Sequence, residues 1–280
     1  MQHKAKKSLG QNFLKSELAL KKIIEAGEIK KGDVILEIGP GKGALTKKLL
    51  EKSETVIAVE KDRELFEFLK ERFEKEIAGG ELILINEDIL EFNISEEIFK
   101  FLSSPRFSGS LSRPDHSKNL RSLRYKIIAN IPYNITGAIL KKFLGGLHQP
   151  ELMVLMVQHE VAKRIIARDQ KESILSISVK AYGDPKLIMK VPARYFSPAP
   201  KVDSAIISIK NISRKTFIKN KINEEKFWEI VKAGFAHKRK KLSGNLKNVC
   251  QNKDLASLEN KRAEDLSLND WIILISLASK

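Results

Sequence analysis

The stretch VILEIGPGKGALT, residues 34–46, passes from a continuous apolar run into three glycines and then into a helix-forming sequence. An apolar run of this kind suits a strand that is covered on both faces of a sheet. Gly39, Gly41 and Gly43 let the backbone turn sharply and approach a ligand closely. The stretch therefore predicts a strand-turn-helix unit with a binding site at the turn, although alone it also fits a dinucleotide site or a purely structural turn.

Further apolar runs recur at the spacing of alternating strands and helices. The strand candidates are residues 34–39, 55–60, 81–88, 125–133 and 152–158, followed by 187–191 and 204–210. Between them lie two helical segments: residues 44–52, and residues 62–78 with Leu65, Phe66, Leu69 and Phe73 on one face. This alternation predicts a doubly wound, parallel α/β sheet with right-handed crossovers, and the last two runs would complete seven strands.

The segments that flank the sheet read as helices and one loop. Ser16 is a candidate cap for a helix over residues 17–26 that Gly27 would end. Past the sheet, Asn223 opens a helix with an apolar stripe, and residues 267–270 form a capping box before another. We therefore expect a sheet domain over residues 1–210 and a small all-helical domain over 211–280. Residues 103–124 hold seven Ser and five Lys or Arg without apolar periodicity, which predicts a basic flexible insertion.

Composition limits the class of protein. The chain has 280 residues, enough for a sizeable core, and Cys250 is its single cysteine, which argues against a disulfide framework and a cysteine-rich zinc site. No apolar run approaches the ~20 residues of a membrane helix, and the first ten residues are too polar for a signal peptide. We expect a cytoplasmic protein that does not associate with a membrane.

The net charge of +16 is distributed unevenly. Residues 23–102 carry 12 Lys and Arg against 19 Asp and Glu, a net charge of −7, whereas residues 181–280 carry 20 against 10, a net charge of +10. Residues 1–22 add +5 and residues 103–124 add +4. Basic flanks around an acidic module suit a polyanionic partner, because Lys and Arg that neutralise phosphates release counterions. A merely solubilising surface fits the charge equally well.

Polar residues follow two neighbouring strands at the points where the strands end. Glu60 ends the second strand about 20 residues past the glycines, where a carboxylate can accept hydrogens from a ribose. Asp88 ends the third strand. Because the carboxyl ends of parallel strands meet at one edge of a sheet, we expect Gly39, Glu60 and Asp88 to converge on one crevice.

The fourth strand ends in Asn130-Ile131-Pro132-Tyr133. The Asn side-chain oxygen and the adjacent backbone carbonyl can each accept a hydrogen from an exocyclic amine, Pro stiffens the turn, and Tyr offers a stacking face. Such a corner suits the amino group of adenine, whose lone pair is conjugated with the ring and must be freed before it can attack. An isolated Asn-Pro turn would not indicate a function. Here it indicates a binding site, because it is expected beside the glycine turn, Glu60 and Asp88.

Taken together, these blocks resemble the rRNA adenine N6-dimethyltransferases, in particular the bacterial enzymes that modify two adjacent adenosines near the 3′ end of small-subunit (16S) rRNA. The matching blocks are KKSLGQNFL (6–14), EIGPGKGALT (37–46), Glu60, NEDIL (86–90), NIPYNIT (130–136), YFSPAPKVDSAIISI (195–209) and FAHKRKKLSGNL (235–246). The resemblance implies a class I, Rossmann-like methyltransferase domain with a helical C-terminal domain. It implies the methyl donor S-adenosyl-L-methionine, a role in ribosome biogenesis and a link to kasugamycin sensitivity.

The resemblance also assigns roles to particular residues. Asn130 would sit between cofactor and target amine, Pro132 would shape that corner, and Tyr133 and Phe196 would stack on the flipped target adenine. The residues implied to bind the cofactor are Asn12, Leu14, Gly39, Gly41, Glu60, Asp88, Ile89 and Asn130. In-line methyl transfer mostly needs positioning in a desolvated pocket. We therefore expect no metal, and the five histidines show no ligand spacing.

Two basic clusters are expected to contact rRNA phosphates. They are Lys4, Lys6 and Lys7 in the N-terminal arm, and Lys238, Arg239, Lys240 and Lys241 in the C-terminal part. The expected partner is small-subunit rRNA in an assembling 30S particle, and the protein is expected to act as a monomer. Two alternatives remain open: an antibiotic-resistance methyltransferase of large-subunit rRNA, and a catalytically idle rRNA-binding assembly factor. A dinucleotide-dependent oxidoreductase fits least well.

Overall fold

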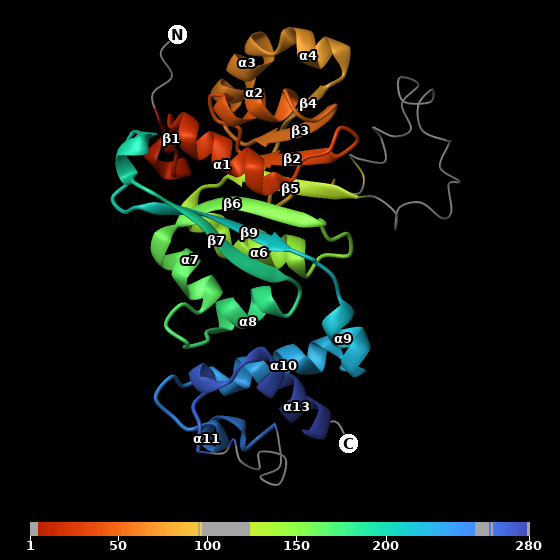
Figure 1. Cartoon of the computed structure of the whole chain (residues 1–280), viewed down its shortest axis with the longest axis vertical. Coiled ribbons are helices and arrows are strands. Elements are labelled where there is room, and N and C mark those ends of the chain that lie inside the picture. Colours follow the sequence, from red (N-terminus) through yellow and green to blue (C-terminus); the bar gives the residue numbers. More distant parts are fainter. Residues whose placement is uncertain (1–4, 95, 97–123, 250–257, 259, 279–280) are drawn as a thin grey trace, which may run out of the picture.

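The structure is a computed structural model of the chain, and it describes residues 5–94, 96, 124–249, 258 and 260–278. Its centre is a seven-stranded sheet with the strand order β4-β3-β2-β5-β6-β9-β7 and helices on both faces (Figure 1). The strands are β2 (Val34–Ile38), β3 (Thr55–Glu60), β4 (Leu82–Asn86), β5 (Tyr125–Asn130), β6 (Leu152–Gln158), β7 (Asp184–Val191) and β9 (Ser204–Lys210). The predicted α/β fold and its seven strands are confirmed.

The sheet is mixed, whereas the strand-helix alternation predicted a parallel one. Strands β2 to β6 pair in parallel, but β9 pairs antiparallel with both β6 and β7. The segment between β7 and β9 holds only the short helix η5 (Ala193–Tyr195) and the two-residue strand β8 (Phe196–Ser197). Neighbouring antiparallel strands can be joined without a crossover helix, which is why this hairpin-like connection reverses the direction of β9.

Alternate residues of the central strands face two different apolar layers. Ile35, Val56 and Ile128 pack in the layer that contains α1 (Glu17–Gly27) and α2 (Ala44–Leu50). Their neighbours along the strands, including Leu36 and Ile57, pack in the opposite layer with the helices that follow β5 and β6. Those helices are α6 (Thr136–Leu144), α7 (His159–Ile166) and α8 (Ile174–Lys180). Burial on both faces explains why the strands read as continuous apolar runs.

The first helix begins as predicted and ends differently. The Ser16 side chain accepts a hydrogen bond from the Ala19 amide, as an N-cap does. Gly27 still belongs to the helix, and the left-handed cap is Glu28, with a φ of 44°. Gly27 is needed for packing instead, because a Cβ atom there would lie 2.5 Å from the Ile128 side chain.

The segment predicted as one helix over residues 62–78 is broken in two. It forms α3 (Arg63–Arg72) and α4 (Glu74–Gly79), separated by Phe73 with a φ of −116°. The Asp62 side chain caps α3 by accepting a hydrogen bond from the Glu64 amide. The break turns the Phe73 ring toward Gly43, where a Cβ atom would lie 2.5 Å from the ring. The helix is therefore interrupted at Phe73, where the ring packs closely against the glycine turn.

The C-terminal helices are α9 (Lys215–Asn220), α10 (Glu224–Gly234), α11 (Leu242–Leu246) and α13 (Leu268–Ala278), with the short turn η7 (Ala263–Asp265). Asn223 caps α10, and Ser267 and Asp270 form the predicted capping box before α13. These helices lie below α8 in Figure 1, and their buried Phe227 and Trp271 continue the apolar layer of α6 to α8. Strand β9 ends at Lys210, but the division into two domains there remains a proposal because this core is continuous.

Three predicted features lie outside the described residues. They are Cys250, Lys4 of the N-terminal arm and almost all of the basic insertion, residues 103–123; only Arg124 of that insertion is described, at the amino end of β5. None of the helices within the described ranges is long and apolar enough to cross a membrane.

Candidate functional site

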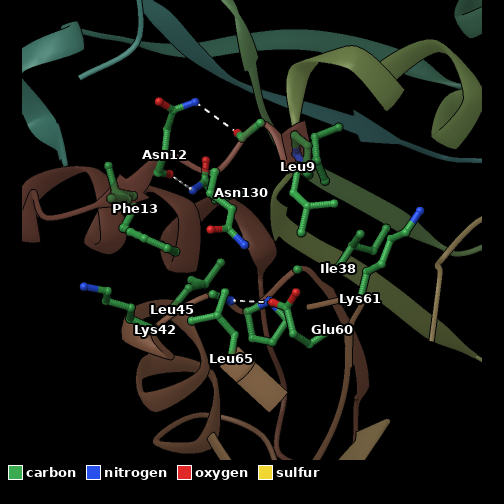
Figure 2. A pocket seen from close by; sticks show the side chains of 18 of the residues that line it. Leu9, Asn12, Phe13, Ile38, Lys42, Leu45, Glu60, Lys61, Leu65 and Asn130 are labelled. Carbon is green, nitrogen blue, oxygen red and sulfur yellow. Dashed lines mark hydrogen bonds between the residues drawn. The ribbon is translucent and has the colours of Figure 1, made fainter. Parts of the chain in front are cut away.

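A cavity of about 390 Å³ lies at the carboxyl ends of β2, β3, β4 and β5 and is covered by the segment around β1 (Phe13–Leu14). This volume is typical of small-molecule sites. Figure 2 shows Asn12 and Asn130 together at one side of the cavity and Glu60 and Leu65 at the other. Every residue that the sequence suggested for the cofactor lines it: Asn12, Leu14, Gly39, Gly41, Glu60, Asp88, Ile89 and Asn130. Pro132 and Tyr133 line it as well.

The glycine turn has the backbone conformation that its sequence predicted. Gly39, Gly41 and Gly43 have φ angles of 63°, 60° and 77°, in the left-handed region that other residues rarely adopt. A Cβ atom on Gly41 would lie 3.0 Å from the Phe13 ring, so the turn and the N-terminal arm are in close contact. The turn thus presents its backbone to the cavity and to the segment that covers it.

Glu60 is almost fully buried, at 6% exposure, and its two carboxylate oxygens accept hydrogen bonds from different backbone amides. Oε2 accepts from Gly41 at 3.1 Å, and Oε1 accepts from Asp62 at 2.9 Å. Burial raises the pKa of Glu60, and the two amides oppose that rise. The amides fix the direction of the carboxylate, while each oxygen keeps a second lone pair that can accept from a ligand hydroxyl.

Asp88 is held in a similar way at the end of β4. Lys61 donates to Oδ2 at 2.7 Å, and the Leu90 amide donates to Oδ1 at 2.9 Å. The Lys61 ammonium is the main reason that the pKa of Asp88 lies below its ordinary value. Asp88 is therefore an oriented, ionised acceptor at the cavity wall. Sequence reasoning missed Lys61, whose only signal was its place next to Glu60.

Glu37 is a second residue that the sequence analysis missed. It lies within β2, is 1% exposed and lines the cavity. Burial raises its pKa to about 8; nearby Thr46 opposes the rise and Glu60 adds to it. Neither Glu37 Oε2 nor the Thr46 hydroxyl has a hydrogen-bond partner among the described residues. A charged residue inside an otherwise apolar strand was the signal that could have identified it.

A polar network around Asp62 holds the N-terminal arm over the cavity. Lys6 Nζ donates to Asp62 Oδ1 at 2.7 Å, and Gln11 Nε2 donates to Asp62 Oδ2 at 2.7 Å. Lys6 also pairs with Glu64 at 3.0 Å. An RNA contact by Lys6, as predicted, would have to compete with these ion pairs. Lys4 lies outside the described residues, and Lys7 belongs to the short helix η1 (Lys7–Leu9).

Asn130 is oriented by the same arm. Its amide nitrogen donates to the backbone carbonyl of Asn12 at 3.1 Å, shown as a dashed line in Figure 2. With the donor side of the amide engaged, the oxygen is left as an acceptor, and no other described residue donates a hydrogen bond to it. The corner of β5 therefore presents a fixed acceptor in the same cavity as Gly39, Glu60 and Asp88; its use for an amine substrate stays a prediction.

Tyr133 and Phe196 are placed differently. Tyr133 lines the cavity, and its hydroxyl lies 2.5 Å from the Ser204 hydroxyl. Burial raises the pKa of Tyr133, and the Ser204 hydrogen bond opposes that rise. Phe196 pairs with Leu14 across β1 and β8, is 2% exposed and does not line the cavity. Stacking of Phe196 on a target base therefore stays a prediction, and it would require the ring to leave this packing.

The predicted C-terminal basic run forms an exposed turn between α10 and α11, which Figure 1 shows on the same side of the molecule as β1. Lys241 donates to Asn260 at 2.8 Å. Within the described ranges, Lys238, Arg239 and Lys240 make no ion pair. Among the residues that the structure describes, no group of three or more His, Cys, Asp or Glu is arranged to hold a metal ion.

Comparisons with known proteins agree with this geometry. The family model for ribosomal RNA adenine dimethylase matches residues 2–280. The chain is 38% identical over 277 residues to ribosomal RNA small subunit methyltransferase A of Dehalococcoides mccartyi, covering 96% of this chain and 86% of the relative. It is 37% identical over 288 residues to the protein of that name from Fusobacterium nucleatum, covering 99% and 98%.

Two solved structures have the same fold. One is a dimethyladenosine transferase from Plasmodium falciparum, with a TM-score of 0.72 and 26% identity over 94% of this chain and 95% of that one. The other is the 23S rRNA methyltransferase ErmE, with a TM-score of 0.71 and 22% identity over 96% and 100%. The family model matches nearly the whole chain, and the residues expected from the resemblance line one cavity. This chain belongs to the ribosomal RNA adenine dimethylase family.

Proposed function

We propose that this chain transfers methyl groups from S-adenosyl-L-methionine to the N6 atoms of two adjacent adenosines near the 3′ end of small-subunit rRNA, and dimethylates each of them. The observation that carries the proposal is the position of Asn130, whose fixed acceptor oxygen lies in the same cavity as the cofactor residues. The small-subunit target is supported by relatives at 37–38% identity that are named small subunit methyltransferase A. We place the reaction in the cytoplasm, on a late 30S assembly intermediate, with the protein acting as a monomer.

The donor groups around the cavity fit S-adenosyl-L-methionine. Glu60 would accept from the ribose hydroxyls, and Asp88 would accept from the adenine amine, both with oxygens already oriented by the backbone. Glu37 Oε2, buried and without a partner among the described residues, could accept from the methionine end, whose positive charge would favour the ionised carboxylate that burial disfavours. The turn at Gly39 and Gly41 would lie against that end. When bound, S-adenosyl-L-methionine supplies an electrophilic methyl group.

Asn130 and its neighbours would prepare the target nitrogen. The Asn130 oxygen and a backbone carbonyl of the Asn130–Pro132 turn would accept the two amine hydrogens, which favours a tetrahedral nitrogen with an available lone pair. Because the Asn12 carbonyl holds the Asn130 amide, the acceptor needs no reorganisation when the target arrives. Methylation makes the amine acidic, so its proton passes to solvent and no side chain is assigned as a base. The cavity must also readmit the monomethylated amine.

The target base has to leave its stack to reach this corner, at a cost of a few kcal/mol. The Tyr133 ring, which lines the cavity, would recover part of that cost by stacking on the base. The phosphates around it would meet the basic surface, which includes the exposed turn with Lys238, Arg239 and Lys240.

A competition experiment tests the proposal against its alternatives. Unmethylated small subunits and large subunits are mixed with the protein and methyl-labelled S-adenosyl-L-methionine, and the two rRNAs are then separated. We expect label as N6,N6-dimethyladenosine in the small-subunit rRNA. Label in the large-subunit rRNA would favour the antibiotic-resistance activity, and RNA binding without transfer would favour the idle assembly factor.

A further inference from the structure

Residues 200–205, PKVDSA, have no role in the site as derived so far. Because β9 is antiparallel, its first residue, Ser204, lies opposite Gln158 and Val191, the last residues of β6 and β7. An antiparallel strand thus begins at the edge where the parallel strands end. The reversal of β9 places the Ser204 hydroxyl beside the corner that follows β5.

The hydroxyls of Ser204 and Tyr133 are 2.5 Å apart, although the residues are 71 positions apart in the sequence. Ser204 is fully buried and does not line the cavity, whereas Tyr133 does. The polar end of the phenol is therefore held by the sheet, and Tyr133 is the member of the pair that borders the cavity. The phenol oxygen lies on the axis of the χ2 torsion, so a hydrogen bond to it fixes the direction of the Cβ–Oη axis, and with it the χ1 rotamer that places the ring.

Ser204 is itself held rigidly through the residue before it. Asp203 Oδ1 accepts from the Ala193 amide at 3.0 Å, and Oδ2 pairs with Lys190 at 2.8 Å. The Asp203 carbonyl accepts from the His159 amide at 3.0 Å. Because contacts from three separate elements hold Asp203, Ser204 is a fixed anchor rather than a side chain that follows Tyr133.

We propose that Ser204 is a positioning residue for methyl transfer: its hydrogen bond to Tyr133 holds the hydroxyl end of the phenol and so fixes the position of the ring on which the target adenine stacks. The proposal rests on the stacking role given to Tyr133 in the proposed function. Reactive geometry is sensitive to such positioning, since a displacement of about 1 Å can cost roughly 100-fold in rate. Ser204 acts through Tyr133 and does not touch the reacting atoms.

Strand β9 offers a matched control. Ser208 is also fully buried, four residues further along the strand, and its hydroxyl has no hydrogen-bond partner among the described residues. Ser208→Ala therefore removes the same atom from the same strand without breaking a hydrogen bond. Any effect of Ser204→Ala beyond that of Ser208→Ala belongs to the contact with Tyr133.

The first experiment measures the single-turnover rate of methyl transfer, together with cofactor and RNA affinities. We expect Ser204→Ala and Tyr133→Phe each to lower the rate about tenfold with both affinities nearly unchanged, because positioning is lost and not binding. The double variant should be no slower than either single one, since both remove the same contact. Ser204→Thr, which keeps the hydroxyl, should recover much of the rate. Multiplicative losses, or a rate for Ser204→Ala equal to that of Ser208→Ala, would overturn the proposal.

The second experiment needs no RNA and so separates this inference from the proposed function. In protein labelled with 3-fluorotyrosine, the ¹⁹F resonance of Tyr133 is assigned through Tyr133→Phe. We expect the Tyr133 signals of the wild type and of Ser208→Ala to coincide, and those of Ser204→Ala to be shifted or broadened because the ring exchanges between positions. Unchanged spectra would refute the anchor even if transfer occurs. A wild type with a fixed ring and no methyl transfer would refute the proposed function and leave the anchor standing.

Discussion

The two halves of the cavity are built in different ways. Most of the proposed cofactor half comes from residues 37–89, a local run of successive strand ends in the acidic part of the chain, and its carboxylates Glu60 and Asp88 are each held by two donors. The proposed target half contains Asn130 and Tyr133, which are held by Asn12 and Ser204 from two distant segments. Local spacing suffices to assemble a cofactor site, whereas the target corner depends on the topology of the whole sheet.

The largest effect is expected in the target half, from Asn130→Ala. The variant loses the acceptor that prepares the amine, so transfer should fall by about 100-fold or more, a loss of the size seen when one preorganised catalytic group is removed. Cofactor affinity, measured by calorimetry, should stay within about twofold because Glu60 and Asp88 are untouched. Asn134→Ala, also at the cavity wall, is the control. Transfer that survives in Asn130→Ala would show that the amine is positioned by other groups.

The next largest effect is expected in the cofactor half, from Glu60→Gln. The new amide group must face either the Gly41 or the Asp62 N–H, where the carboxylate now accepts. We expect cofactor affinity to fall about 30-fold, or ~2 kcal/mol, since hydrogen bonds to a charged group are lost. RNA affinity, measured by filter binding, should not change. A loss of RNA binding with normal cofactor affinity would reverse the assignment of the two halves.

The residues in these two predictions show how much of the site could be derived from the sequence alone. Spacing identified Gly39, Glu60 and Asp88 because parallel strands end at a common edge. The direction of β9 was not predictable from its apolar run, since an antiparallel strand buried on both faces has the same pattern. The contact between Tyr133 and Ser204 could not be predicted either, because it depends on the direction of β9. The ion pair that occupies Lys6 was also missed, because a lysine in a basic arm looks the same whether it is paired or free.

A smaller effect, on the free energy of unfolding, is expected from Glu37→Gln in the proposed cofactor half. Burial raises its pKa to about 8, so between its ordinary pKa and that value the folded state keeps a proton that the unfolded state releases. Stability should therefore fall as pH rises through that window in the wild type. Glu37→Gln removes this slope and should gain about 1–2 kcal/mol relative to wild type between pH 6 and pH 7.

Urea unfolding at the two pH values, without cofactor, measures this difference. Glu67→Gln, an exposed carboxyl on α3, is the control and should follow the wild-type profile. Parallel pH profiles for wild type and Glu37→Gln would mean that Glu37 does not bind a proton on folding.

The smallest effect is expected outside both halves, in the basic turn after α10. Arg239→Ala should weaken RNA binding about two- to threefold at physiological salt and reduce the slope of log affinity against log salt by roughly one. Lys75→Ala, exposed on α4 in the acidic part, should change neither quantity. Binding titrations at several salt concentrations make the comparison. An equal effect of both variants would mean that the turn contributes only general charge.

The most direct test of the central claim is to count and place the methyl groups. Small subunits without these modifications are incubated to completion with the protein and S-adenosyl-L-methionine, and the rRNA is digested and examined by mass spectrometry. We predict two methyl groups on N6 of each of two adjacent adenines near the 3′ end, and almost none when Asn130→Ala replaces the wild type for the same incubation time. Methylation at any other nucleotide, or full methylation by Asn130→Ala, would contradict the account.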